Sequence, residues 1–427
     1  MAAIHRAGFE VWLVGGAIRD FLAGFPPHDW DVATNAPSRR LMALFPKVIP
    51  IGIQHNTLQI HTGERTVEVN SFEGSGPEAI VRDLGRRDFT VNALAAAHPS
   101  GAILDPFGGR ADLNAGILRA VGDADARFRE DPLRTLRAGR FVSVFGWTIE
   151  AATFEALRRH AGRLRSTAVE RIREELFKLL GGTNITAAFD CMHLGGVIPV
   201  ILPEMPTACT EPGKGSDRCV YERLVACVQH APNRLRLRLA ALFQRIAEPA
   251  ETGPGPEKST LYPSETSERS AELAGKILFR LKAARKLTLP VVKLVEWQIP
   301  SQQQEWKDAD IRRAMAAVGI DLVDDLLDLA CADRLAAGAK ASEMAAVQAL
   351  RSRFEAQRKA SPPLQLKDLA VSGHDLMRIL GVPPGPLLGE VLAELHRVVI
   401  EDPTCNTFRD LIAHAQKKLL RMTSIGL

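Results

Sequence analysis

The chain has 427 residues, of which 46% are hydrophobic and 24% charged, the composition of an ordinary globular protein. Its 54 Lys and Arg residues against 50 Asp and Glu residues leave a formal net charge of only +4, so any basic surface must be local. No apolar run approaches the ~18 residues that predict a membrane span. Because the first strand-like run begins at Val11, we expect no leader peptide, no membrane association and a cytoplasmic location.

Short β-type runs and short helices alternate up to about residue 125. Strands are predicted at 11–14, 29–32, 58–61 and 67–69 because β-type runs there are punctuated by Gly and Pro. Beyond residue 125 apolar residues recur at helical spacing. The predicted fold class is therefore α+β, with a small mixed head followed by an all-helical remainder.

One predicted helix and two breaks illustrate the helical part. Thr167 and Glu170 fit a capping box that opens a helix over 170–180, and Gly181 is expected to end it. Residues 251–270 carry Gly, Pro, Ser and Thr without periodicity, which predicts a surface loop. Pro362 and Pro363 precede a final helical unit.

The first chemical motif joins a glycine turn to two carboxylates. The run 11–14 leads into Gly15 and Gly16 and then a helix, and the next strand carries Asp29 and Asp31. Period 2 places both carboxylates on one face of that strand, and oxygen ligands in this arrangement suit Mg²⁺. A glycine turn lets backbone N–H groups approach a triphosphate. In this order the parts predict nucleotidyl transfer with two metal ions, although each part alone is more often a plain turn or a solvated loop.

Two further clusters lie at predicted helix starts. Around Arg87 and Asp88, polar residues precede an apolar run, so Asp88 either caps a helix or accepts from ribose hydroxyls while Arg87 contacts phosphate or sugar. Asp131 precedes Pro132, which favours a capped helix start, yet the i, i+3 spacing also sets Asp131 beside Arg134. A carboxylate and a guanidinium together match the amino group and ring acceptor of cytosine and adenine, and they reject uracil and guanine.

In this order the motifs resemble those of the class II tRNA nucleotidyltransferase/poly(A) polymerase family, which includes the bacterial-type CCA-adding enzymes. The resemblance rests on segments along most of the chain: 15–20 with 29–34, 86–92, 105–109, 130–134, 170–176, 194–204 and 372–385. It implies a polymerase-β-like nucleotidyltransferase head (1–125), a helical neck that recognises the base (126–205), a helical body (206–360) and a tRNA-binding tail (361–427).

The resemblance also implies roles for individual residues. Asp29 and Asp31 would be catalytic and hold two Mg²⁺ ions, with Glu68 as a third carboxylate or an ordinary strand residue. Nucleotide binding would fall to these residues: Gly15, Gly16, Arg19, Arg87, Asp88, Asn92, Asp131, Arg134 and Arg137. The substrates would be CTP, ATP and the acceptor stem and 3′ end of tRNA, without an obligatory protein partner. Basic residues that could contact RNA phosphates, or simply form solvated faces, are Arg163, Arg165, Lys282 and Lys286.

Two departures from the family pattern keep alternatives open. The segment 70–85 is shorter than the Arg-rich flexible loop of full CCA-adding relatives, which makes CC-only or A-only addition a competing prediction. A bacterial poly(A) polymerase is a further alternative, and an RNA-binding protein with an inactive head is one of another class. Phe243 and Gln244 stand where hydrolase-bearing relatives have metal ligands, so no phosphohydrolase site is expected.

Overall fold

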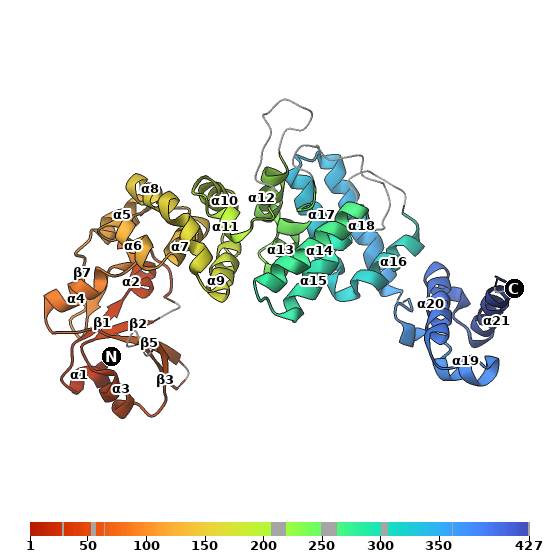
Figure 1. The fold of residues 1–427 in the computed structure, drawn as a ribbon, viewed down its shortest axis with the longest axis horizontal. Helices are drawn as coiled ribbons and strands as arrows, with labels where there is room; N and C mark the ends of the chain where they lie inside the picture. Colours follow the sequence, from red (N-terminus) through yellow and green to blue (C-terminus); the bar gives the residue numbers. More distant parts are fainter. Residues whose placement is uncertain are drawn as a thin grey trace. The chain divides into compact units, whose positions relative to one another are not determined.

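The computed structural model describes residues 1–27, 30–52, 57–63, 65–205, 219–248, 263–299, 306–360 and 362–425. The chain forms two compact units, Met1–Pro203 and Glu204–Leu427 (Figure 1). The predicted α+β class is confirmed: the sheets lie in the first unit and the rest of the described chain is helical. The division into head, neck, body and tail stays a prediction.

The first unit contains a seven-stranded sheet in the order β3-β4-β5-β2-β1-β6-β7. All neighbouring strands are antiparallel except β2 and β5, which are parallel. The strands of this sheet are β1 (Val11–Val14), β2 (Asp31–Thr34), β3 (Val48–Gly52), β4 (Thr57–Thr62), β5 (Arg65–Ser71), β6 (Ala95–Ala97) and β7 (Ile103–Leu104). A separate parallel pair consists of β8 (Ile117–Leu118) and β9 (Thr148–Ile149).

Helices cover both faces of the sheet because its strands alternate apolar side chains between two cores. Val11 and Val32 pack with residues of α1 and α3 on one face, whereas Val14 and Ala33 pack with Ile80 of α4 on the other. The helices around the sheet are α1 (Ala2–Arg6), α2 (Gly16–Leu22), α3 (Ser38–Leu44), α4 (Pro77–Leu84) and α5 (Gly109–Ala115).

The remainder of the first unit is a helical extension. It consists of α6 (Ala124–Glu130), α7 (Leu133–Phe145), α8 (Ala151–His160), the 3₁₀ helix η3 (Ala161–Ser166), α9 (Val169–Leu180), α10 (Ile185–Leu194) and α11 (Ile198–Ile201). Helix α9 ends at Gly181 as expected, but the predicted capping box is wrong, because Ala168 is the N-cap and no side chain caps the helix. Thr167 instead continues from η3 in an extended conformation.

The second unit is helical throughout its described residues. Its helices are α12 (Val220–His230), α13 (Leu235–Phe243), α14 (Glu265–Arg280), α15 (Arg285–Glu296), α16 (Asp308–Val318), α17 (Val323–Ala336), α18 (Ala341–Lys359), α19 (Gly373–Leu380), α20 (Pro386–Glu401) and α21 (Phe408–Ile425). The loop predicted up to residue 270 is wrong from Glu265 onward, because the Ser264 hydroxyl accepts from the Ser267 N–H and starts α14 there. Residues 251–262 lie outside the described residues.

No helix in the described part of the chain combines the length and the apolar character needed to cross a bilayer. Phe243 and Gln244, at the end of α13, are both buried. The Gln244 amide donates to Cys227 Sγ at 3.0 Å and to Asp333 Oδ1 at 3.1 Å. These two residues therefore belong to the packing between α13 and its neighbours.

Candidate active site

The site begins at the turn between β1 and α2. Gly15 is the N-cap of α2 and has φ 73° and ψ −133°, a conformation that favours glycine. A Cβ atom at Gly15 would lie 2.6 Å from Arg87 Nη1 and 3.6 Å from Asp31 Oδ2. Three residues predicted separately from the sequence, Gly15, Asp31 and Arg87, therefore meet at this turn.

Asp31 lies at the start of β2, which has β1 on one side and β5 on the other. It is paired in register with Val14 of β1 and with Glu68 of β5. Because directly opposed residues in a sheet share a face, the Asp31 and Glu68 side chains point to the same side. Asp29 lies outside the described residues, and β2 begins at Asp31, later than the predicted start at residue 29. Asp31 and Glu68 supply carboxylate oxygens, the ligand type that Mg²⁺ prefers.

Arg19 links the glycine turn to the helical extension. Its Nη1 donates to Asn92 Oδ1 at 2.6 Å, and it forms an ion pair with Asp20 at 2.7 Å. Its guanidinium also lies over two aromatic rings of α7, 4.9 Å from the centre of Phe145 and 5.4 Å from that of Phe141. Arg19 therefore links α2 to α7.

Asp88 is buried and is surrounded by donors. Its carboxylate accepts from the Phe89 N–H at 2.8 Å, from Asn92 Nδ2 at 3.0 Å and from Arg137 Nη2 at 2.7 Å. Burial alone would raise the pKa of Asp88, but the charge of Arg137 and these hydrogen bonds outweigh it and hold the pKa well below its ordinary range. The helix predicted after Asp88 is wrong: only a 3₁₀ turn, Thr90–Asn92, forms before β6.

Asp131 and Arg134 are held by separate partners rather than by each other. Asp131 Oδ1 accepts from the Leu133 N–H at 3.2 Å at the start of α7, and its Oδ2 lies 2.8 Å from Arg171 Nη2 of α9. Arg134 Nη1 pairs with Glu130 at 2.8 Å, and its Nη2 donates to the Arg86 carbonyl at 2.7 Å. The Asp131 side chain is thereby tied to α9, and the Arg134 side chain to the backbone of Arg86.

The structure adds one buried residue that the sequence reasoning did not assign to the site. Glu175 of α9 is 4% exposed and lies 3.3 Å from Arg140 and 3.6 Å from Arg137. A carboxylate on the apolar face of an amphipathic helix, together with two arginines spaced i, i+3, is the signal that could have indicated it. Glu175 therefore connects α9 to the arginine that holds Asp88.

The four predicted RNA-contacting residues are exposed. Arg163 and Arg165 lie on η3 in the first unit, whereas Lys282 and Lys286 lie at the α14–α15 junction in the second.

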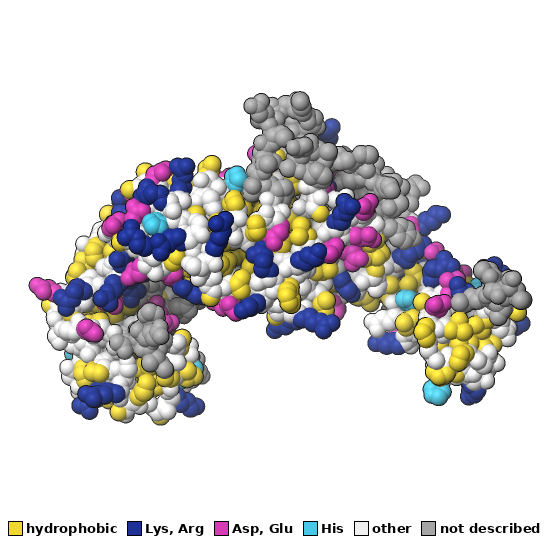
Figure 2. All heavy atoms as spheres, viewed as in Figure 1, with side chains coloured by type: hydrophobic (Ala, Val, Ile, Leu, Met, Phe, Trp, Pro, Cys, Tyr) yellow, Lys and Arg dark blue, Asp and Glu magenta, His cyan; other side chains and the backbone are white. Residues whose placement is uncertain are grey.

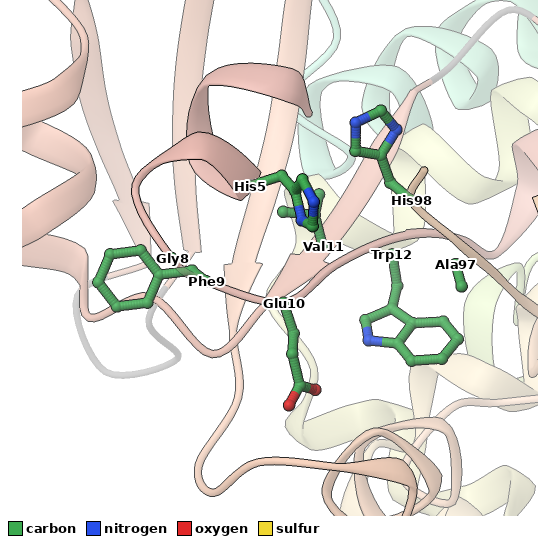
Figure 3. A pocket seen from close by; sticks show the side chains of 8 residues that line it. All are labelled: His5, Gly8, Phe9, Glu10, Val11, Trp12, Ala97 and His98. Carbon is green, nitrogen blue, oxygen red and sulfur yellow. The ribbon is translucent and has the colours of Figure 1, made fainter. Parts of the chain in front are cut away.

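A cavity of about 260 Å³ lies at the opposite end of β1 from Gly15 (Figure 3). The His5 and His98 rings meet edge to face there, with their centres 5.5 Å apart, while Glu10 and Trp12 project to the other side of the strand in Figure 3. Glu10 Oε1 accepts from the Gly76 N–H at 2.7 Å and so ties the short connection between β5 and α4 to the sheet. None of the predicted site residues lines this cavity.

Three family models match the chain. The poly A polymerase head domain matches residues 11–119, and domain 2 of tRNA nucleotidyltransferase matches residues 266–415. A model described as "Probable RNA and SrmB- binding site of polymerase A" matches residues 146–209. The head match includes Gly15, Asp31 and Arg87, and the third match includes Arg163 and Arg165.

Two similar proteins show how far the likeness extends. The CCA-adding enzyme of Latilactobacillus sakei is 31% identical over 433 residues, covering 97% of this chain and 95% of that protein. The CC-adding tRNA nucleotidyltransferase of Halalkalibacterium halodurans is 41% identical over 201 residues, but these cover only 47% of this chain and 52% of that protein. The chain belongs to the tRNA nucleotidyltransferase/poly(A) polymerase family that contains the bacterial CCA-adding enzymes.

Solved structures agree with this assignment. The Bacillus stearothermophilus CCA-adding enzyme in complex with CTP superposes with a TM-score of 0.73 at 27% identity and covers 99% of this chain and 97% of that chain. The Thermotoga maritima CCA-adding enzyme, complexed with tRNA, superposes with a TM-score of 0.58 at 21% identity over 97% of this chain and 93% of that chain, and it shows the fold alone.

Proposed function

We propose that this protein is a template-independent tRNA nucleotidyltransferase that adds C and A residues from CTP and ATP to the 3′ end of tRNA. The observation that carries the proposal is that the Asp31 carboxylate and the Arg87 guanidinium both lie close to Gly15, at the turn where α2 begins. A cation and a carboxylate beside a glycine turn at the start of a helix suit a metal-bound triphosphate. The proposed catalytic pair is Asp31 with Asp29.

The residues at the turn suit Mg²⁺ because the Asp31 and Glu68 carboxylates share one face of the sheet. We propose that Asp31, with Asp29 and Glu68, holds the metal ions. When bound, Mg²⁺ lowers the pKa of an attacking hydroxyl and stabilises the oxygens of the leaving group. The task of this chain's own residues is orientation: Gly15 and Gly16 keep the backbone close to the phosphates, and Arg87 neutralises phosphate charge.

Base selection is assigned to Asp131 and Arg134. A carboxylate that accepts from an exocyclic amine and a guanidinium that donates to a ring nitrogen together fit cytosine and adenine, whereas uracil and guanine would leave buried polar groups unpaired. The contacts of Asp131 with Arg171 and of Arg134 with Glu130 support this role, since they orient both side chains before a base arrives. The pocket would thus use the same two side chains for both nucleotides.

Sugar recognition is assigned to the neighbouring network of Arg19, Asp88, Asn92 and Arg137. Its hydrogen bonds run without a gap from α2 to α7. Arg163 and Arg165, in the segment that matches the RNA-binding family model, are proposed to contact tRNA phosphates. A cytoplasmic location stays a prediction from the sequence.

Partial addition is the second candidate, and one observation favours it. Only residues 72–76 connect β5 to α4, and Glu10 holds this short segment at Gly76. A restrained connection leaves little freedom for a site that must accept first C and then A.

The test is an extension assay with tRNA transcripts that end at the discriminator base, at C and at CC. Each receives CTP, ATP or both with Mg²⁺, and the products are resolved to single nucleotides. Growth to CCA supports the first candidate, whereas a stop at CC or use of the CC transcript alone assigns partial addition. A long ladder of A residues would assign a poly(A) polymerase. No incorporation by a folded protein that still binds tRNA would refute the catalytic proposal.

Two variants sharpen this assay. Asp31→Asn keeps the shape of the side chain but removes its charge, so incorporation should fall at least 100-fold while tRNA binding is retained. The matched control is Asp321→Asn, which removes the charge of a carboxylate in the second unit, outside the proposed site. This variant should extend tRNA at the wild-type rate.

A further inference from the structure

An unusual turn joins α14 to α15. The Lys282 N–H donates to the Phe279 carbonyl and the Ala283 N–H to the Leu278 carbonyl, both at 2.9 Å, which is the Schellman pattern at a helix end. The left-handed position of this motif is normally glycine, but here it is Lys282, with φ 52°. Among the residues that the structure describes, Lys282 alone has a positive φ without being glycine. The turn therefore keeps a lysine at a cost in stability.

An exposed aromatic side chain and exposed basic side chains surround this turn. Phe279 is 84% exposed, the largest value among the exposed large hydrophobic residues of the described chain. Arg285 and Lys286 follow at the start of α15, are exposed, and have no ion-pair partner within the described ranges. By contrast, the neighbouring Arg280 is neutralised by Glu204 at 2.7 Å.

Figure 2 shows Lys and Arg side chains gathered over the part of the second unit where Figure 1 labels α15, beside exposed hydrophobic ones. An aromatic ring flanked by cations suits single-stranded or terminal bases of nucleic acid, because the ring face stacks on a base while the cations contact phosphates. A protein partner would instead be expected to cover a broader apolar patch that carries fewer charges.

We propose that the α14–α15 turn is an RNA contact, in which Phe279 stacks on a base and Lys282, Arg285 and Lys286 contact the flanking phosphates. This inference rests on the proposed function, since it takes tRNA as the RNA. The left-handed Lys282 is explained by it: glycine would be the more stable residue at this position, but it would remove a cation three residues from Phe279.

The test compares stability with RNA affinity in the full-length protein. Lys282→Gly should raise Tm by about 2 °C, because it relieves the left-handed backbone. The same variant should weaken binding of a fluorescein-labelled tRNA transcript, measured by anisotropy without nucleotide, about threefold. Lys282→Ala keeps the backbone strain and should weaken binding equally without raising Tm. Each lost phosphate contact should also reduce the slope of log affinity against log salt by about 1.

The stacking step is tested at Phe279. Phe279→Ala and Phe279→Leu should each weaken tRNA binding by roughly 5-fold or more, whereas Phe279→Trp should preserve it. In extension assays these losses should appear in the KM for tRNA and not in kcat. The matched control is Arg269→Ala on the same helix, an exposed arginine that pairs with Glu265, and its affinity should equal that of the wild type.

The outcomes separate the two proposals. If wild-type protein binds and extends tRNA but Phe279→Leu binds as well as wild type, the stacking inference is overturned and the proposed function stands. If Phe279→Ala instead abolishes self-association in sedimentation and leaves tRNA affinity unchanged, the turn is a contact between copies and the inference is also overturned. Failure of the wild type itself to bind tRNA would refute the proposed function.

Discussion

Replacing Gly15 with alanine tests the geometry on which the proposed site depends. An alanine Cβ would lie 2.6 Å from Arg87 Nη1, whereas ordinary contacts begin at 3.4 Å, so Nη1 must move by 3.4 − 2.6 = 0.8 Å. The end of an arginine side chain moves easily, and this displacement itself costs little stability. The backbone at φ +73° and ψ −133°, a conformation that favours glycine, is what should destabilise the variant, by about 1–3 kcal/mol.

The activity of Gly15→Ala should fall far more than its stability. A displacement of about 1 Å in a positioning group can reduce a rate roughly 100-fold. We therefore expect a loss of this size in the single-turnover rate of CTP incorporation at saturating tRNA. The free energy of unfolding, measured by urea denaturation, should fall only by the roughly 1–3 kcal/mol that the backbone conformation costs.

Gly101→Ala is the control for the effect of placing an alanine at a positive φ. Gly101 has φ +71°, close to the value at Gly15, but nothing lies within 4 Å of the Cβ that would be added. Both variants place an alanine at positive φ and should lose stability, but only Gly15→Ala should lose activity. Equal single-turnover rates for the two variants would refute the inference that Arg87 and Asp31 meet functionally at this turn.

Two further substitutions test the helical extension. Gly182→Ala would bring a Cβ within 2.1 Å of Ser143 Oγ and 2.5 Å of its carbonyl, so the unfolding free energy should fall by about 3 kcal/mol; an unchanged Tm would contradict this packing. The pKa of Asp88 is lower in the folded than in the unfolded chain, so its contribution is present above about pH 4 and is lost as the pH falls further. Asp88→Asn should therefore be less stable than the wild type at pH 7 by about 1–3 kcal/mol. Its unfolding free energy should also fall less than that of the wild type between pH 5 and pH 3. An unchanged dependence of stability on pH would contradict the inference that Asp88 is charged in the folded protein.

The local parts of the fold could be predicted because their signals are short-range. The β1 strand, the Gly15 turn and the end of α9 follow from residue patterns within a few positions. Where prediction failed, tertiary contacts decided the outcome. The run after Asp88 has an apolar pattern that suits a helix, but the chain must enter β6 beside β1, so only a 3₁₀ turn forms.

The partners of the site residues could not be predicted because they lie far apart in the chain. Arg19 and Asn92 are separated by 73 residues, and Asp88 and Arg137 by 49. A single sequence shows that each of these residues is polar and near a helix end, which caps and solvated faces share. Only the arrangement of α2 against α7 distinguishes an arginine in a network from one in solvent.

That arrangement has a consequence for how the first unit works. The turn proposed to hold phosphates and the helix proposed to read the base are joined through Arg19, which hydrogen-bonds Asn92 and lies over the rings of Phe141 and Phe145. A shift of α2 would therefore pull on α7, which carries Arg134 and Arg137 near its start. If the same two side chains accept both C and A, as proposed, small movements of α7 would change which base fits, and Arg19 is the contact through which those movements would reach the phosphate turn.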